Sequence, residues 1–277
     1  IQPDHLDRHG TFDAYRKLKH RIAENQRAED SLIVNADDTG INASTIKTLA
    51  TIRTFTTSKF ESALVSVQDD QLSLRVENDQ LSILHRSDLI IPGDHNLSNA
   101  AAAAAATSLL HIDVNTISEA LREFEGVEHR LERIKPVAGV DFVNDSKATN
   151  VDSVCVAIRA IDPPIHLICG GRDKGSSYQP IIEAGKDRIK NVVAIGEARE
   201  KIFNDLGRAF SVQFATTLEE AVQKTFESAI PGETVMLSPG CASFDMFGNF
   251  EQRGLAFKAA VANLKKGKRN NETSANA

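Results

Sequence analysis

Polar groups capable of chemistry gather in residues 140–150, which run Val-Asp-Phe-Val-Asn-Asp-Ser-Lys-Ala-Thr-Asn. The apolar, β-branched start of this segment is typical of a buried strand, and residues 151–161 carry apolar side chains at helical spacing. In open α/β sheets, ligands bind at the carboxyl ends of the strands, and a helix start offers free N–H groups to an anion. The carboxylate, ammonium and hydroxyl groups at this junction therefore predict a binding site.

Two later loops also follow predicted strands. Gly170-Gly-Arg-Asp-Lys-Gly175 combines glycines, which permit tight turns, with Lys174, whose point charge suits a carboxylate or phosphate. Ser238-Pro-Gly-Cys-Ala-Ser-Phe-Asp-Met-Phe247 is rich in small residues before Asp245. Either loop alone fits an ordinary turn, but three such loops on strand ends predict one shared crevice.

The elements that must position these loops alternate between strand and helix, which predicts an α/β fold whose mostly parallel sheet is covered on both faces. The strands are expected at 137–143, 165–169, 191–195, 211–214 and 234–237. The helices are expected at 151–161, 178–188, 198–206, 217–229 and 250–265. We place a domain boundary at Gly126, which gives domains at 1–125 and 126–265 and a charged, disordered tail at 266–277.

The first domain begins with a predicted helix over 11–28, with Phe12, Tyr15, Leu18 and Ile22 on one face. A strand over 31–35 and β-hairpins within 58–92 follow. Seven alanines, 100–106, predict a helix capped by Asn96 or Ser98, and a further helix is expected over 117–124.

Composition narrows the function. The 277 residues carry a net charge of −6 without a concentrated basic face, which argues against nucleic-acid binding. The three cysteines lack metal-ligand spacing and are expected to be buried, as in a reducing compartment. No apolar run approaches the ~20 residues of a membrane helix, so a cytoplasmic protein is expected.

Taken together, three motifs resemble the Mur ligases, and most closely the members that add D-glutamate. They are Asn144-Asp-Ser-Lys-Ala-Thr-Asn150, Gly170-Gly-x-Asp-Lys174, and Leu237-Ser-Pro-x-Cys-Ala-Ser-Phe-Asp-x-Phe247 followed by Asn249-Phe-Glu-Gln-Arg-Gly254. The resemblance extends from Pro3-Asp-His-Leu-Asp-Arg8, through His95-Asn-x-x-Asn99 and His129-Arg130, to Phe257. It therefore covers nearly the whole chain.

The resemblance implies a partial central ATPase domain followed by a Rossmann-like C-terminal domain, in a monomeric enzyme of peptidoglycan synthesis. Such a ligase uses ATP and Mg²⁺ to convert the carboxylate of UDP-N-acetylmuramoyl-L-alanine into an acyl phosphate, which the amine of D-glutamate attacks. The substrates are small molecules, and neither nucleic acid nor membrane takes part.

The same resemblance assigns roles to individual residues. His5 matches a magnesium ligand, and Lys19 matches a lysine that becomes a carbamate, an anionic oxygen donor suited to Mg²⁺. Without the resemblance, His5 and Lys19 would be an inert histidine and a solvated charge. The positions matching the nucleotide pocket are Asn96, Asn99, His129, Arg130 and Asp145.

Lys147 and Thr149 match positions that contact phosphate and substrate. The positions matching the site of the incoming amino acid are Thr149, Lys174, Ser243, the Phe244 backbone and Phe250. D-Glutamate brings two carboxylates, which a lysine, hydroxyl groups and backbone donors can bind. Ser243 is not expected to be a nucleophile, because it lacks the Gly-x-Ser-x-Gly surroundings.

The sequence departs from the family in one respect, since no Gly-x-x-x-x-Gly-Lys-Ser/Thr pattern occurs in it. We expect that phosphate-binding loop, and a UDP-binding domain, to precede Ile1, and we expect the 277 residues alone not to consume ATP. Two alternatives stay open: another Mur or folylpolyglutamate-type ligase, and a non-catalytic nucleotide-binding module.

Overall fold

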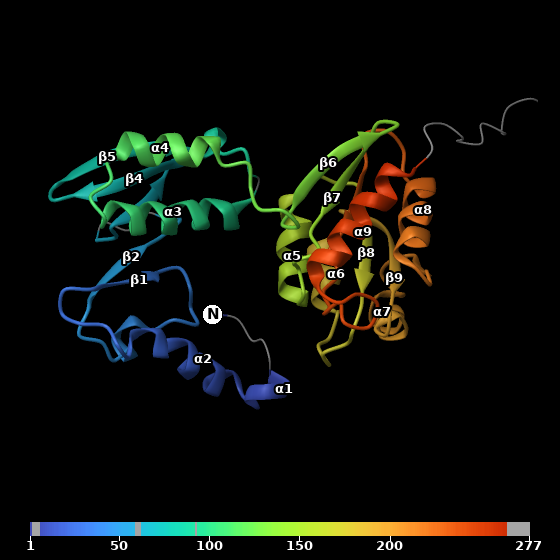
Figure 1. Cartoon of the computed structure of the whole chain (residues 1–277), viewed down its shortest axis with the longest axis horizontal. Coiled ribbons are helices and arrows are strands. Elements are labelled where there is room, and N and C mark those ends of the chain that lie inside the picture. The colour runs from blue at the N-terminus through green and yellow to red at the C-terminus, as the bar shows by residue number, and fades with distance from the viewer. Residues whose placement is uncertain (2–5, 59–61, 92, 265–277) are drawn as a thin grey trace, which may run out of the picture. The chain divides into compact units, whose positions relative to one another are not determined.

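The computed structural model describes residues 1, 6–58, 62–91 and 93–264. His5 and the tail at 266–277 lie outside the described residues, so the expectations about them stay predictions. The chain divides into two compact units, unit 1 at residues 1–125 and unit 2 at residues 126–277 (Figure 1).

Unit 1 contains a five-stranded sheet in the order β1-β2-β3-β4-β5. The first three strands are parallel and the last three form antiparallel hairpins. Their bounds are Ser31–Asn35, Thr51–Phe55, Val65–Gln68, Gln71–Val76 and Asp79–His85. The hairpins predicted within 58–92 are thus confirmed, whereas β2 was missed because its alternating side chains are mostly polar.

The alanine run forms the middle of α3 (Asp94–Ser108), which packs with α4 (Val114–Glu123) over the hairpin strands. Ala101, Ala104 and Ala105 are fully buried, because side chains this small let the helix backbone approach the sheet closely. The helix prediction is confirmed, but the predicted caps are wrong. The N-cap is Gly93, with a φ of 97°, and both proposed capping residues lie inside the first turns.

Before the sheet, unit 1 has α1 (Leu6–His9), α2 (Phe12–His20) and a 3₁₀ turn over Arg21–Ala23. The α-helix predicted over 11–28 is therefore too long. Its predicted apolar face is also largely wrong, since Tyr15 is buried while Leu18 and Ile22 are 43% and 78% exposed. Two further 3₁₀ turns lie at Ala43–Thr45 and Arg86–Asp88.

Unit 2 contains a six-stranded sheet in the order β10-β9-β8-β11-β7-β6, in which only β6 is antiparallel to its neighbour. The strands, β6 to β11, span Glu132–Val137, Val140–Asn144, Ile165–Gly170, Ile189–Ile195, Val212–Phe214 and Thr234–Leu237. The strand predicted over 137–143 is confirmed at 140–143 as part of β7, but its start is wrong, because residues 138–139 form the turn of the hairpin β6–β7. Its two turn residues, Ala138 and Gly139, both have positive φ, which suits the twist of a two-residue hairpin turn.

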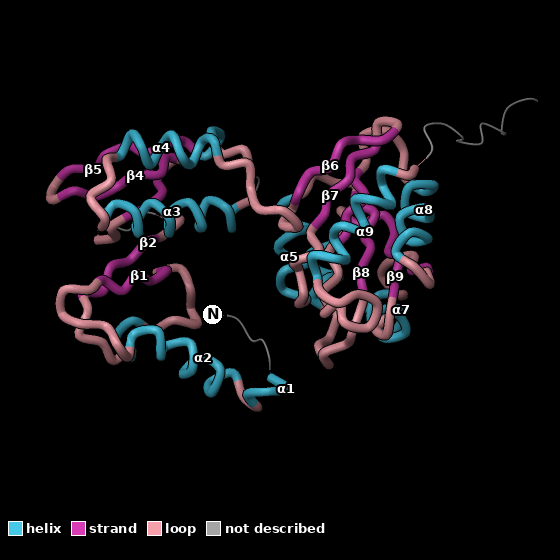
Figure 2. Tube along the Cα trace, viewed as in Figure 1, coloured by secondary structure: helices cyan, strands magenta, loops and turns pink. Residues whose placement is uncertain are grey.

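Helices cover the two faces of this sheet, as Figure 2 shows in cyan against magenta strands. They are α5 (Val151–Ala160), α6 (Pro180–Gly185), α7 (Arg199–Leu206), α8 (Leu218–Ser228) and α9 (Phe250–Ala262). Side chains alternate along β8: Leu167 and Cys169 join the core under α5, α6 and α7, whereas Ile168 joins the core under α8 and α9. The predicted parallel sheet with helices on both faces is confirmed.

A cluster of polar and charged side chains connects β8, β9 and β11 at their amino ends. The His166 imidazole lies 2.8 Å from Asn191 Oδ1 through one nitrogen and 2.8 Å from Glu233 Oε2 through the other. Lys190 Nζ donates to Glu233 Oε1 at 2.7 Å. Burial opposes ionisation of Glu233, yet these hydrogen bonds outweigh it and lower its pKa to about 2. The cluster lies at the end of the sheet opposite the polar loops.

Candidate functional site

The three polar loops follow strands that are neighbours in the sheet of unit 2. β11 pairs with β7 on one side and β8 on the other, so residues 144–150, 170–175 and 238–247 leave adjacent strand ends. Gly170, the last residue of β8, occupies a position that only glycine fits. It has a φ of +120°, and a Cβ on it would lie 2.1 Å from the carbonyl oxygen of Ile195.

Backbone hydrogen bonds join these loops to one another. Gly240 N donates to Ala148 O at 2.9 Å, and Gly170 N donates to Pro239 O at 2.8 Å. A further bond, Arg172 N to Ala242 O at 2.9 Å, links the second and third loops. The predicted convergence of the loops therefore occurs within unit 2, and main-chain hydrogen bonds contribute to it.

Asp145 lies in the middle of this loop cluster and is 7% exposed. Its carboxylate accepts a hydrogen bond from Leu131 N at 3.3 Å and another from Ser238 Oγ at 2.8 Å. Burial nevertheless dominates and raises the pKa of Asp145 to about 7, although the hydrogen bonds and the Arg130 charge act in the other direction. Asp145 can therefore exchange a proton near neutral pH.

Arg253 belongs to the motif at 249–254, but no role could be predicted for it from the sequence. Its guanidinium is fully buried and donates to Ser146 Oγ at 3.0 Å, to Ser146 O at 2.9 Å and, from both terminal nitrogens, to Cys241 O at 3.2 Å. Burial lowers its pKa to about 10, so it stays cationic at neutral pH. Arg253 thus fastens the first and third loops to α9 by a planar fork that lysine cannot reproduce.

The predicted substrate residues of unit 2 lie in and beside these loops. The Lys147 ammonium stands over the Phe250 ring, 3.8 Å from its centroid, in a cation–π contact. Ser243 is buried, and its carbonyl accepts hydrogen bonds from two following backbone N–H groups. The Phe244 side chain is 63% exposed. Thr149, Lys174 and Phe250 are half-buried.

Two predicted nucleotide residues lie just before β6. The His129 imidazole is buried against α9, edge-on to Phe250 with ring centroids 6.3 Å apart. Arg130 is exposed. The carbonyl of His129 accepts a hydrogen bond from Lys147 N at 3.1 Å, which joins this segment to the first loop.

The remaining predicted residues belong to unit 1. Asn96 and Asn99 lie in the first two turns of α3, where Asn99 Nδ2 donates to Asn96 Oδ1 at 3.2 Å. Lys19 is exposed near the end of α2, with its Nζ 5.1 Å from the centre of the Tyr15 ring.

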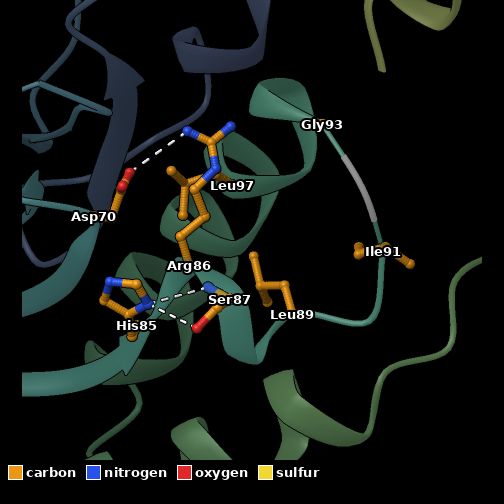
Figure 3. Close-up of a pocket in the computed structure, with 8 residues that line it drawn as sticks. All are labelled: Asp70, His85, Arg86, Ser87, Leu89, Ile91, Gly93 and Leu97. Carbon is orange, nitrogen blue, oxygen red and sulfur yellow. Dashed lines mark hydrogen bonds and ion pairs between the residues drawn. The ribbon is translucent and has the colours of Figure 1, made fainter. Parts of the chain in front are cut away.

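Unit 1 also has an open pocket of about 320 Å³ beside the start of α3 (Figure 3). It is lined by Asp70, His85, Arg86, Ser87, Leu89, Ile91, Gly93 and Leu97. Its one cation, Arg86, forms ion pairs with Asp70, at 3.6 Å, and with Asp94. The charge that could bind an anion there is already balanced.

Within the described part of the chain, the one group of side chains spaced to hold a metal ion is Glu128, His129 and Glu132. Lys258 Nζ lies 2.9 Å from Glu128 Oε1 and 2.6 Å from Glu132 Oε1. One ammonium therefore already pairs with both carboxylates and offsets half of their charge, so in this structure the group is an ion-pair network.

The cysteines Cys155, Cys169 and Cys241 are all buried and unbridged, as predicted. Burial raises the pKa of the Cys241 thiol to about 11, and the Tyr178 hydroxyl lies 2.7 Å from its sulfur. These thiols are packing groups rather than nucleophiles. Among the described helices, none has the length and apolar character needed to cross a membrane.

Comparison with known proteins shows which family both units of the chain resemble. The model for the Mur ligase middle domain matches residues 1–107, and the model for the Mur ligase glutamate ligase domain matches residues 129–241. The UDP-N-acetylmuramoylalanine–D-glutamate ligase of Thermoanaerobacter sp. (strain X514) is 43% identical over 96% of this chain. That of Alkaliphilus oremlandii is 40% identical over 96%. The chain spans 60% and 59% of the lengths of these relatives.

Solved structures share the fold at lower identity. MurF from Acinetobacter baumannii superposes with a TM-score of 0.69 at 19% identity, covering 94% of this chain and 58% of that protein. Folylpolyglutamate synthase from Mycobacterium tuberculosis, complexed with ADP and AMPPCP, gives 0.66 at 16% identity, covering 94% and 62%.

Proposed function

The chain belongs to the Mur ligase family, and from that premise we propose that it forms part of an enzyme that couples D-glutamate to UDP-N-acetylmuramoyl-L-alanine. The observation that carries the proposal is the 40–43% identity, over 96% of the chain, to relatives with this name. The fold neighbours described above carry other names and are 16–19% identical to this chain, so they support the fold alone.

The proposed reaction activates a poor electrophile. ATP transfers its γ-phosphoryl group to the substrate carboxylate, giving an acyl phosphate and ADP. The amine of D-glutamate then attacks the acyl carbon, the carbon–oxygen bond to phosphate breaks, and the amine gives up a proton, leaving an amide and inorganic phosphate. Catalysis of this kind depends on positioning and on neutralising phosphate charge, which are the tasks we assign to the residues below.

We assign nucleotide binding to Asn96 and Asn99 in unit 1 and to His129, Arg130 and Asp145 in unit 2. The assignment follows the family motif and is supported in unit 2 by position. Asp145 lies at a carboxyl end of a parallel strand, where α/β sheets bind ligands, and keeps a titratable carboxyl group there. Arg130 is exposed next to it, so its charge is accessible to a phosphate.

We assign the contact with the reacting phosphate to Lys147 and the binding of D-glutamate to Thr149, Lys174, Ser243 and the Phe244 backbone, with Phe250 packing beside them. The Phe250 ring holds the Lys147 ammonium by the cation–π contact, which links the two subsites. D-Glutamate presents two carboxylates and one amine. Lys174 and the hydroxyl groups suit the carboxylates, and the outward-turned Phe244 side chain leaves its backbone to the ligand.

A magnesium site is the remaining part of the proposal, with His5 and Lys19 as ligands. Lys19 fits this role only as a carbamate, because its ammonium form repels a cation. Its amine is exposed, and no carboxylate among the described residues pairs with it, so carbon dioxide can reach it. A bound Mg²⁺ would offset the charge of the phosphates. We further propose a monomeric cytoplasmic enzyme acting on small molecules.

Binding of D-glutamate to the 277-residue chain tests the proposal directly. Titration of the ¹⁵N-labelled chain should shift amide signals of the loops at 170–175 and 238–247, and L-lysine and meso-diaminopimelate should not. Lys174→Ala should weaken D-glutamate binding about tenfold, which corresponds to loss of one charge-assisted hydrogen bond. Lys186→Ala, at an exposed position away from the loops, is the matched control.

A hybrid enzyme then tests turnover. The segments of the Thermoanaerobacter ligase that this chain does not span would be joined to it, and phosphate release would be measured with each amino acid. Release that depends on D-glutamate supports the proposal, and a preference for a diamino acid would assign the chain to another Mur ligase. Nucleotide binding without any turnover would favour a non-catalytic module.

A further inference from the structure

The hydrogen bonds around the His129 imidazole determine which of its nitrogens carries a proton. A neutral imidazole has one N–H donor and one acceptor nitrogen, and the partner of one nitrogen fixes the state of the other. The nearest partner of His129 Nδ1 is the side-chain nitrogen of Asn144, at 2.9 Å. Asn144 is fully buried, so water does not compete for this contact.

The orientation of the Asn144 amide follows from two of its other partners, Ser146 and Glu132. Ser146 N, a donor, lies 3.2 Å from Asn144 Oδ1. Glu132 Oε2, an acceptor, lies 2.9 Å from Asn144 Nδ2. Turning the amide over would place its oxygen against a carboxylate and its NH₂ group against an N–H. A third acceptor, the Gly254 carbonyl oxygen, lies farther from Asn144 Nδ2, at 3.4 Å. An amide NH₂ group can only donate, so at 2.9 Å it donates to His129 Nδ1, which must then be unprotonated.

The Glu132 carboxylate is itself held in place as an acceptor. Lys258 Nζ donates to Oε1 at 2.6 Å, and the backbone N–H of His129 donates to Oε2 at 3.0 Å. Hydrogen bonds to Glu132 and Glu128 raise the pKa of Lys258, which keeps this ammonium charged. Only one assignment of donors and acceptors is therefore consistent along the network that runs from Lys258 through Glu132 to Asn144.

The His129 ring has little freedom to escape this arrangement. It packs against the backbone of Gly254, where a Cβ would lie 2.2 Å from Nδ1, and its edge faces Phe250. The other nitrogen, Nε2, lies 3.9 Å from the Glu128 carboxylate, which is too long for a hydrogen bond. Among the described residues, no other carboxylate forms an ion pair with Nε2.

We propose that Asn144 is a positioning residue that holds His129 as the neutral Nε2–H tautomer, so that the ring meets a ligand as a hydrogen-bond donor. The ligand group must then be an acceptor, and the nucleotide offers ring nitrogens, hydroxyl oxygens and phosphate oxygens. This last step rests on the proposed function, whereas the tautomer itself does not.

The experiment is a two-bond ¹H–¹⁵N correlation spectrum of the histidine rings in the ¹⁵N-labelled 277-residue chain, with His129 assigned by His129→Gln. At neutral pH, Nδ1 should give the signal of an unprotonated ring nitrogen and Nε2 that of a protonated one. In Asn144→Asp a carboxylate replaces the NH₂ donor, so the unprotonated Nδ1 signal should be lost. Asn150→Asp, which adds the same charge at an N-cap in the same loop, should keep it.

A wild-type spectrum with the proton on Nδ1, or on both nitrogens, would overturn the proposal, and this result does not depend on whether Asn144→Asp folds. An unchanged His129 spectrum in a folded Asn144→Asp chain would also overturn it. Addition of ADP separates the two claims, because binding should shift the Nε2 signal and leave Nδ1 unprotonated. The predicted tautomer with no response to ADP would refute the nucleotide role of His129 while confirming the action of Asn144.

Discussion

Replacing Asp145 by asparagine should change how the stability of unit 2 depends on pH. The pKa of Asp145 rises from an ordinary 3.8 to about 7 in the folded chain, mainly because the carboxyl group is buried. Between these values the folded chain holds a proton that the unfolded chain releases, so the free energy of unfolding falls as pH rises from about 4 to about 7. Above that window this group adds no further pH dependence.

The size of the effect follows from the two pKa values. The difference, 7 − 3.8, is about 3 pKa units, and at 1.36 kcal/mol per unit it amounts to about 4 kcal/mol. An asparagine side chain should fit the site, since its oxygen can accept from Leu131 N and its NH₂ group can donate to the Ser238 hydroxyl, as a neutral acid would. We therefore expect Asp145→Asn to gain stability relative to the wild type as pH rises.

Urea unfolding followed by circular dichroism from pH 4 to pH 8 measures this difference, and the absence of tryptophan makes fluorescence less useful. Asp162→Asn is the matched control, because Asp162 is exposed in the same unit and should show no such trend. If the difference between Asp145→Asn and the wild type stays constant across this range, the carboxyl group is ionised throughout and the reasoning fails.

Other substitutions test packing and charge. Gly254→Ala places a Cβ 2.2 Å from His129 Nδ1, so the ring must move and stability should fall by about 1–3 kcal/mol, measured by urea unfolding. Ala104→Leu should lower the melting temperature by overpacking the core of unit 1, whereas Ala103→Leu on the exposed side of the same helix should not. Glu233→Gln should flatten the loss of stability as pH falls from 4.5 towards 2, because the lowered pKa of this carboxyl stabilises the fold only above that range; an equally steep loss in the variant would contradict it.

The polar loops of unit 2 could be predicted because two regular patterns bracket each of them. An apolar run such as 165–169 and a helical spacing such as 151–161 leave little choice for the segment between, and the parallel sheet then brings the strand ends together. Parallel pairing of β11 with both β7 and β8 places the three loops as expected. The strand β6 could not be predicted in this way, because Lys135 and Pro136 interrupt its alternation of apolar and polar residues.

The contacts that complete the site were not visible in the sequence. Arg253 lies in a helix among charged residues, and its burial follows only from the backbone carbonyls that surround it. Asn144 ends β7, and its partners are His129, just before β6, and Glu132, the first residue of β6. Such contacts depend on which carbonyls and amides the fold brings within hydrogen-bonding distance, and residue spacing carries no record of that. The prediction for α2 was wrong for a related reason, because the spacing of its apolar residues does not indicate that the Leu18 side chain faces solvent.

The loops at the strand ends are joined by main-chain hydrogen bonds from Gly240, Gly170 and Arg172. Peptide groups are present whatever side chains the loops carry, so the frame of the site survives changes in the residues that face the ligand. Under the proposed function, a few side-chain replacements could therefore exchange one amino acid substrate for another without rebuilding the loops. Engineering of new amide-forming specificities should begin at the half-buried positions, Thr149 and Lys174, and spare the glycines.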